Sequence, residues 1–99
     1  MARFLIEVTH SPEKQACLRA IHSFLSTGSH YMTNADWGCL DGEHKAWLIV
    51  DVDCKEDAGR IVPPEFRDGM RVIQLSKFFV NKGEQLLMAH TGNETLAIR

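Results

Sequence analysis

The chain of 99 residues is the size of one domain, and its composition of 44% hydrophobic and 24% charged residues is typical of a globular protein. Its formal net charge of −2, without a basic run, argues against nucleic-acid binding, which requires positive charge against phosphates.

Two further features bear on where the protein works. No apolar stretch approaches the roughly 20 residues that cross a bilayer, and the short apolar run near the N-terminus is broken by Glu7. We therefore expect neither a membrane span nor a signal peptide. The cysteines, at 17, 39 and 54, are odd in number and form no Cys-x-x-Cys motif, which favours reduced thiols in a cytoplasmic protein.

The first two elements follow from the spacing of apolar residues. Residues 3–10 alternate apolar and other side chains, which predicts a strand. Ser11-Pro12-Glu13 is typical of a helix start, with Ser11 as the cap, and Gly28 marks its end. The apolar stripe of this helix consists of Cys17, Leu18, Ile21, Phe24 and Leu25.

Asp41-Gly42 predicts a tight turn of type I′ between strands at about 31–40 and 43–52. In that register Leu40 faces Glu43, and Cys39 lies directly opposite His44. One face of the hairpin is then apolar and belongs to the core, with Trp37 as a packing residue. The other face carries a mixture of polar and apolar side chains.

The remaining elements are a helix, a strand and a tail. Asp53-Cys54-Lys55-Glu56 predicts the start of a second helix, whose buried side is Ala58, Ile61 and Val62, and Pro63-Pro64 ends it. The last strand is predicted at residues 70–78. A short helix is predicted from Lys82 to His90, and a frayed tail from Thr91 onward.

This order of strand, helix, strand, strand, helix, strand predicts an α+β, ferredoxin-like βαββαβ fold in residues 1–80, followed by a C-terminal short helix and tail in 81–99. Right-handed crossovers place both helices on one face of a four-stranded antiparallel sheet. The bare face would carry Leu5, Glu7, Thr9, Asn34, Asp36, Trp47, Ile49 and Asp51. Its apolar members predict a symmetric homodimer joined through the sheet faces.

The pattern resembles the dimeric α/β-barrel superfamily of small ferredoxin-like proteins. The segments Gly28-Ser29-His30-Tyr31, Ala46-Trp47-Leu48-Ile49-Val50 and Val62-Pro63-Pro64-Glu65-Phe66-Arg67 are also similar to a group of small bacterial proteins of unknown function. The resemblance covers about residues 3–78. It implies the fold and the dimer, but no activity, because none of the superfamily's catalytic motifs matches this chain.

A first candidate site combines His10, Cys39 and His44. Cross-strand partners have Cβ atoms about 4.5–5.5 Å apart, and the end of the first strand lies beside the start of the third. Two imidazoles and a thiolate suit Zn²⁺ or a similar metal. The same residues could form a nucleophile and base pair, or simply pack in the core.

A second candidate site lies on the bare face. Glu7 and Asp36 could be catalytic carboxylates with raised pKa values in an apolar cavity, and Asn34, Trp47 and Asp51 could bind a ligand there. Alternatively, these carboxylates form ion pairs with Lys45 or Arg3.

The residues thus leave three functions open. The first is binding of a small organic molecule between sheet faces, with or without cofactor-free proton transfer. The second is a structural or protein-interaction role, in which the tail meets a partner. The third is metal binding by His10, Cys39 and His44. The sequence identifies no cofactor and leaves open whether the protein is an enzyme.

Overall fold

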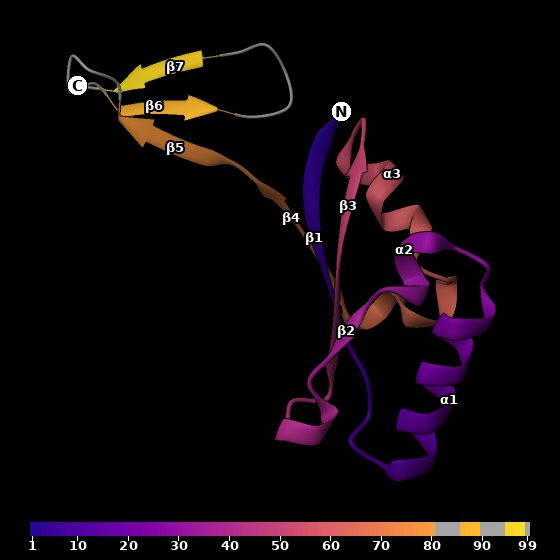
Figure 1. Ribbon diagram of the computed structural model, residues 1–99. Helices are drawn as coiled ribbons and strands as arrows, with labels where there is room; N and C mark the ends of the chain where they lie inside the picture. Colours follow the sequence, from indigo (N-terminus) through magenta and orange to yellow (C-terminus); the bar gives the residue numbers. More distant parts are fainter. Residues whose placement is uncertain (81–85, 90–94, 99) are drawn as a thin grey trace.

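The computed structural model describes residues 1–80, 86–89 and 95–98 and shows an α+β protein built on an antiparallel sheet. The sheet has the order β2-β3-β1-β4 (Figure 1). Its strands are β1 (Ala2–Thr9), β2 (Asp36–Trp37), β3 (Lys45–Val52) and β4 (Met70–Leu75). In the register of the central strands, Ile6 lies opposite both Leu48 and Val72.

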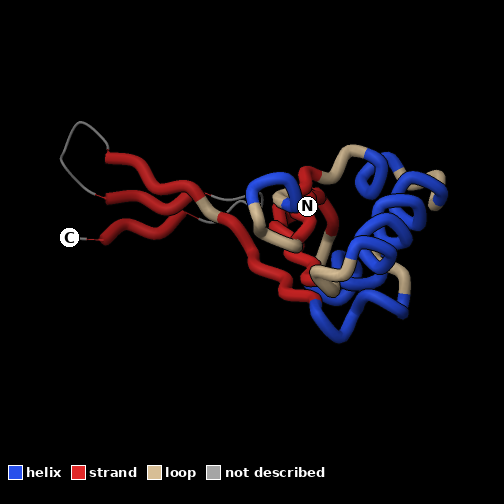
Figure 2. Tube along the Cα trace, turned by 90° about the horizontal axis from the view of Figure 1, so that it is seen from below, coloured by secondary structure: helices blue, strands red, loops and turns tan. Residues whose placement is uncertain are grey.

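The helices all lie on one face of this sheet (Figures 1 and 2). They are α1 (Lys14–Ser26), α2 (His30–Thr33) and α3 (Lys55–Ile61), and a 3-10 turn, η2 (Pro64–Gly69), precedes β4. The core between the layers consists of Phe4, Ile6, Val8, Phe24, Met32, Ala46, Leu48, Val50, Ala58 and Val62. The alternation of β1 and β3 and the buried side of α3 are therefore confirmed.

Helix α1 buries fewer of its apolar side chains than the sequence predicted. Phe24 is fully buried, but Leu18 and Leu25 are 50% and 57% exposed. Its start also differs from the prediction, because the first helical residue is Lys14 and the Glu13 N–H donates to Ser11 Oγ over 3.3 Å. Ser11 thus caps a turn ahead of the helix. No described helix is long and apolar enough to cross a membrane.

The predicted hairpin has the right register and the wrong turn. Asp36 pairs with Trp47, and Trp37 pairs with Ala46. The turn is a wider loop containing the 3-10 turn η1 (Cys39–Asp41), which ends at Gly42 with a positive φ of 83°. The Gly38 N–H donates to Lys45 O over 3.1 Å, which continues the ladder into this loop. The type I′ turn is wrong because the chain coils at Cys39 instead of reversing sharply.

The first strand of that hairpin is also shorter than predicted. Residues 30–33 form α2, because the Ser29 side chain accepts a hydrogen bond from the Met32 N–H (3.4 Å) and begins a helical turn. Met32 is buried in the core by this turn, with only 1% of its surface exposed. Local capping therefore prevails over the strand pattern at these residues.

A second sheet of three strands follows β4, in the order β5-β6-β7. Its strands are β5 (Lys77–Val80), β6 (Leu86–Ala89) and β7 (Thr95–Ile98). The sheet projects from the body on the side that the helices leave bare (Figures 1 and 2). The predicted final strand, 70–78, is therefore two strands that belong to different sheets.

The short helix predicted from Lys82 to His90 is wrong where the structure describes it. Leu86–Ala89 is a strand paired with β5, and Thr95–Ile98, predicted as frayed tail, pairs with β6. A short apolar run has no clear period, so pairing with a neighbouring strand decides its structure. Residues 81–85, 90–94 and 99 lie outside the described residues, and the domain boundary at residue 80 stays a prediction.

Candidate metal centre

Four potential metal ligands converge where the strands β1 and β3 meet the helix layer. They are His10, Cys17, Cys39 and His44, and their ligand atoms all lie within 4.8 Å of one another. We call these residues the thiol–imidazole cluster. All four side chains are half-buried, so the cluster is shielded from water without being deep in the core.

Each ligand comes from a different segment of the chain. His10 directly follows β1, and its N–H donates to the carbonyl of His44, which directly precedes β3 (3.0 Å). Cys17 lies in the first turn of α1, where its N–H donates to Glu13 O (2.9 Å), and Cys39 begins η1. The backbone therefore brings together residues that are up to 34 positions apart, from 10 to 44.

The closest contacts involve three of the four side chains. Cys17 Sγ is 3.3 Å from Cys39 Sγ, and His10 Nε2 lies 3.3 Å from Cys17 Sγ and 3.2 Å from Cys39 Sγ. The ring of His44 lies edge-on to that of His10, with centroids 5.7 Å apart. A tetrahedral zinc site has Zn–S bonds of about 2.3 Å, which separates two sulfurs by about 3.8 Å. The cluster is slightly more compact than that.

The ring nitrogens add a second observation. Nδ1 of His10 and Nδ1 of His44 are both buried, and neither has a hydrogen-bond partner among the described residues. A buried polar nitrogen without a partner costs free energy, typically about 1–3 kcal/mol. At His44 either a bound ion or an ordered water would remove this cost. At His10 the nitrogen beside the sulfurs is Nε2, so an ion in the cluster would leave the cost at Nδ1 to be removed by an ordered water.

Aromatic side chains hold the cluster from the core side. The His10 ring lies edge-on to Trp37 (5.7 Å between centroids), and Trp37 packs in turn against Phe24 (4.8 Å). Trp37 is therefore a packing residue, as the sequence predicted. These contacts orient the His10 ring with its Nε2 toward the two sulfurs.

Burial shifts two pKa values in the cluster. The pKa of His10 is lowered from its ordinary value, first by burial and then by the neighbouring His44. The pKa of the Cys39 thiol is raised, first by burial and then by its contact with Cys17. Both shifts favour the neutral form of the group, the uncharged His10 imidazole and the protonated Cys39 thiol, in the absence of a metal.

Sequence reasoning placed His10, Cys39 and His44 together but did not find Cys17. The structure brings the three together by a different route, because Cys39 lies in η1 and not on a strand opposite His44. Cys17 was assigned to the apolar stripe of α1. The available signal was its position in the first helical turn, seven residues after His10, where the chain doubles back beside the strand end.

The bare-face residues form ion pairs and hydrogen bonds. Glu7 accepts a hydrogen bond from Trp47 Nε1 (3.2 Å) and lies 3.7 Å from Lys45 Nζ and 3.4 Å from Arg71 Nη1. The pKa of Glu7 is lowered, first by the Trp47 hydrogen bond and then by Lys45 and Arg71, against the opposing effect of burial. The raised pKa that we expected for Glu7 is therefore wrong, because three donors stabilise its charge.

Of the other residues predicted for that face, Asp36 and Asp51 lie on strands of the sheet, but the placement of Asn34 there is wrong because residues 30–33 form a helix. Asp51 pairs with Arg3 over 3.2 Å, and Asp36 is exposed opposite Trp47 in the register. Asn34 ends α2, where its side-chain amide donates to His30 O over 2.8 Å. The structure joins the side chains of Glu7 and Trp47 directly, and neither of these side chains forms a hydrogen bond or ion pair with Asn34 or Asp51.

Replacing Trp47 by phenylalanine tests this description of Glu7. The substitution keeps the aromatic ring and removes the N–H donor, so we expect the Glu7 pKa to rise toward its ordinary value of 4.5. Because the pKa is lowered in the folded state, the stabilisation from Glu7 is present above pH 4.5 and is lost as the pH falls through the folded pKa. Carboxyl NMR titration measures the shift, and an unchanged Glu7 pKa in Trp47→Phe would contradict the assignment.

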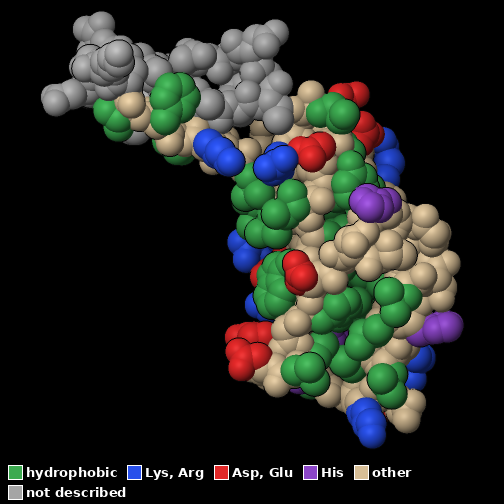
Figure 3. Space-filling view, viewed as in Figure 1, with side chains coloured by type: hydrophobic (Ala, Val, Ile, Leu, Met, Phe, Trp, Pro, Cys, Tyr) green, Lys and Arg blue, Asp and Glu red, His purple; other side chains and the backbone are tan. Residues whose placement is uncertain are grey.

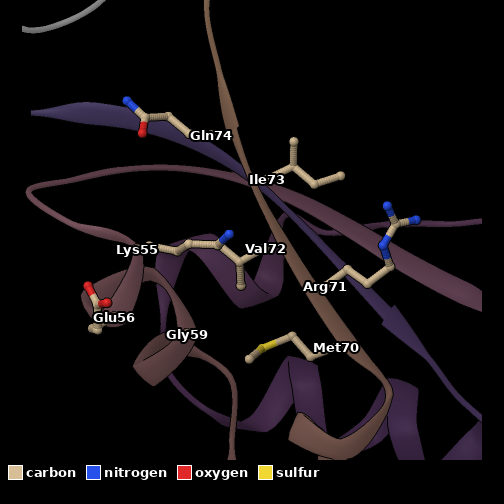
Figure 4. Close-up of a pocket in the computed structure, with 8 residues that line it drawn as sticks. All are labelled: Lys55, Glu56, Gly59, Met70, Arg71, Val72, Ile73 and Gln74. Carbon is tan, nitrogen blue, oxygen red and sulfur yellow. The ribbon is translucent and has the colours of Figure 1, made fainter.

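Two hollows on the surface lie away from Glu7. An open groove of about 670 Å³ separates α3 from β4, and Figure 4 shows Met70, Val72 and Gln74 pointing toward α3 across it. A second hollow of about 460 Å³ lies beside α1 and includes His10 and Arg19 in its lining. His10 therefore belongs both to the thiol–imidazole cluster and to the lining of this hollow.

Comparison with known proteins adds no relative: no family model, no curated protein and no solved structure matches this chain.

Proposed function

We propose that this protein binds a single thiophilic metal ion, with Zn²⁺ the best fit, through His10, Cys17, Cys39 and His44. The observation that carries the proposal is the convergence of four ligand atoms within 4.8 Å from four separate segments. Side chains that meet in this way from the end of a strand, a helix, a 3-10 turn and the start of another strand are positioned by the whole fold.

The type of ligand supports a zinc-like ion. Two thiolates and two imidazoles form one of the usual tetrahedral sets for structural zinc. Such soft donors discriminate against Mg²⁺ and Ca²⁺, which prefer oxygen. Two thiolates also balance the charge of a divalent ion, so the loaded site would be neutral and compatible with half-burial.

The arrangement favours a structural or metal-holding role over catalysis. Four protein ligands complete a tetrahedron, whereas a catalytic zinc ion keeps one position for water or substrate. The ion would attach η1 and the first turn of α1 to the strand ends at His10 and His44. It would therefore act as a cross-link at this end of the sheet.

Metal analysis of the reduced protein, purified without a histidine tag, tests this function. We expect about one equivalent of Zn²⁺ per chain, with affinity falling on the order of a hundredfold or more when Cys17 or Cys39 is replaced by serine, because four ligands share the binding free energy. Cys54→Ser is the matched control, since Cys54 is exposed at the start of α3, beyond the opposite end of β3. Substoichiometric Zn²⁺ that does not rise on adding the metal would contradict the proposal.

A second proposal concerns the bare face of the sheet. Ile49 and Ile73 are 53% and 37% exposed there, beside the half-buried Trp47. Figure 3 shows hydrophobic side chains gathered on the body beneath the projecting sheet. Several charges on this face are paired within the chain, as Glu7 with Lys45 and Arg3 with Asp51, which suits burial against a second copy. We therefore propose a homodimer that covers this face.

Replacing Ile49 by glutamate tests the dimer. The exposed isoleucine tolerates the change within one chain, but a new charge would be buried in the interface, so we expect the variant to be monomeric. Leu40→Glu is the control, because Leu40 is fully exposed on η1. Analytical ultracentrifugation measures both. A monomeric wild-type protein at micromolar concentration would contradict the dimer.

The finer features of the fold and the other functions remain proposals. The strand order β2-β3-β1-β4 with helices on one face supports a ferredoxin-like arrangement and the resemblance to the dimeric α/β-barrel superfamily. Small-molecule binding at Glu7 stays a prediction without support from its contacts. The exposed Phe78, Phe79 and Val80 of β5 are the feature that favours a protein-interaction role.

A further inference from the structure

The two sulfurs of the thiol–imidazole cluster are close enough to react with each other. Cys17 Sγ and Cys39 Sγ lie 3.3 Å apart and have to approach to about 2.05 Å to form a disulfide. Cys17 lies in α1 and Cys39 lies in η1, and the two cysteines are 22 positions apart in the sequence. The bond would therefore close one loop within the chain and involve no second molecule.

The loop that carries Cys39 can supply this movement. The backbone hydrogen bonds of η1 are local, from Asp41 N–H to Gly38 O and from Gly42 N–H to Cys39 O. A shift of η1 toward α1 thus breaks no bond of the β1–β3 ladder. Leu40, the next residue, has its side chain entirely in solvent, so packing of Leu40 does not oppose the shift.

Resting on the proposed metal function, we propose that the thiol–imidazole cluster is a redox switch: a peroxide joins Cys17 to Cys39 and releases the metal ion. Oxidation removes both negatively charged ligands at once. The two imidazoles that remain are a much weaker site for a divalent ion. The oxidised chain would keep α1 attached to η1 by a covalent bond in place of the metal.

The chemistry balances with hydrogen peroxide as the oxidant. One thiolate attacks a peroxide oxygen, which gives a sulfenic acid and, after protonation of the leaving hydroxide, one water. The second thiolate attacks the sulfenic sulfur, forms the S–S bond and expels hydroxide, which takes a proton to become the second water. The cysteines lose two electrons, the peroxide gains two, and the metal leaves as the divalent ion.

The test uses the full chain as Cys54→Ser, so that the exposed third thiol cannot link two molecules. The reduced protein is loaded with Zn²⁺ and then exposed to hydrogen peroxide. A chromogenic zinc chelator follows release of the ion, and mass spectrometry of the digest identifies a Cys17–Cys39 peptide pair. We expect one ion released per disulfide formed, and recovery of full Zn²⁺ binding after treatment with a dithiol reductant.

The outcomes separate this inference from the function on which it rests. Zn²⁺ that stays bound during oxidation, or leaves while the cysteines become sulfinic acids without a Cys17–Cys39 link, would overturn the switch but not the metal site. Reduced protein that takes up no Zn²⁺ before peroxide is added would overturn both. Cys39→Ser is the control for the mass spectrometry, because this variant can form no disulfide with Cys17 and should give no linked peptide pair.

Discussion

Saturating Zn²⁺ is expected to raise the melting temperature of the reduced protein by about 15 °C or more. A ligand that binds the folded state alone, at about 1,000 times its Kd, adds about 4.1 kcal/mol to the free energy of unfolding. In a domain of this size each kcal/mol shifts the melting temperature by about 4–8 °C. His10 and Cys17 lie near the start of the segment that connects β1 to β3, and Cys39 and His44 lie near its end. Unfolding therefore separates the four ligands.

Differential scanning calorimetry with two variants makes this expectation specific. Cys17→Ser should lose most of the Zn²⁺-dependent shift, and Cys54→Ser should retain it, because Cys54 lies outside the cluster. Mg²⁺ should have no comparable effect, since it prefers oxygen ligands. An equal shift in Cys17→Ser and wild type would show that Zn²⁺ acts elsewhere on the chain.

Replacing Phe24 by alanine is expected to lower the free energy of unfolding by about 3–5 kcal/mol. Phe24 is fully buried and contacts both Trp37 and Phe66, with ring centroids 4.8 Å and 5.4 Å away. Its removal leaves a cavity beneath Trp37, which holds the ring of His10. We therefore expect weaker Zn²⁺ binding as well, as a secondary effect of lost packing.

Leu25→Ala is the matched control for this substitution. Leu25 is the next residue of the same helix and is 57% exposed, so its truncation should change the free energy of unfolding by no more than about 0.5 kcal/mol. Urea denaturation followed by tryptophan fluorescence measures both variants. Similar losses in the two would show that Phe24 does not fill the core as described.

The sequence alone determined the features that depend on local periodicity. Alternation in residues 4–8 and 46–50 identified the buried sides of β1 and β3, and Ala58 and Val62 identified the buried side of α3. These predictions succeed because an apolar side chain that repeats with the period of its element has one face on which to be buried. The register of β2 on β3 was also available from the sequence.

The tertiary structure decided the turn, the C-terminal strands and the full ligand set. The loop at Asp41-Gly42 coils as a 3-10 turn, and Leu86–Ala89 becomes a strand because β5 lies beside it. In the sequence Cys17 is one apolar residue of a helical stripe, and only the packing of α1 against the end of β1 places it beside His10. Ligands from distant segments share no period, so only the packing of those segments could bring Cys17 to His10, Cys39 and His44.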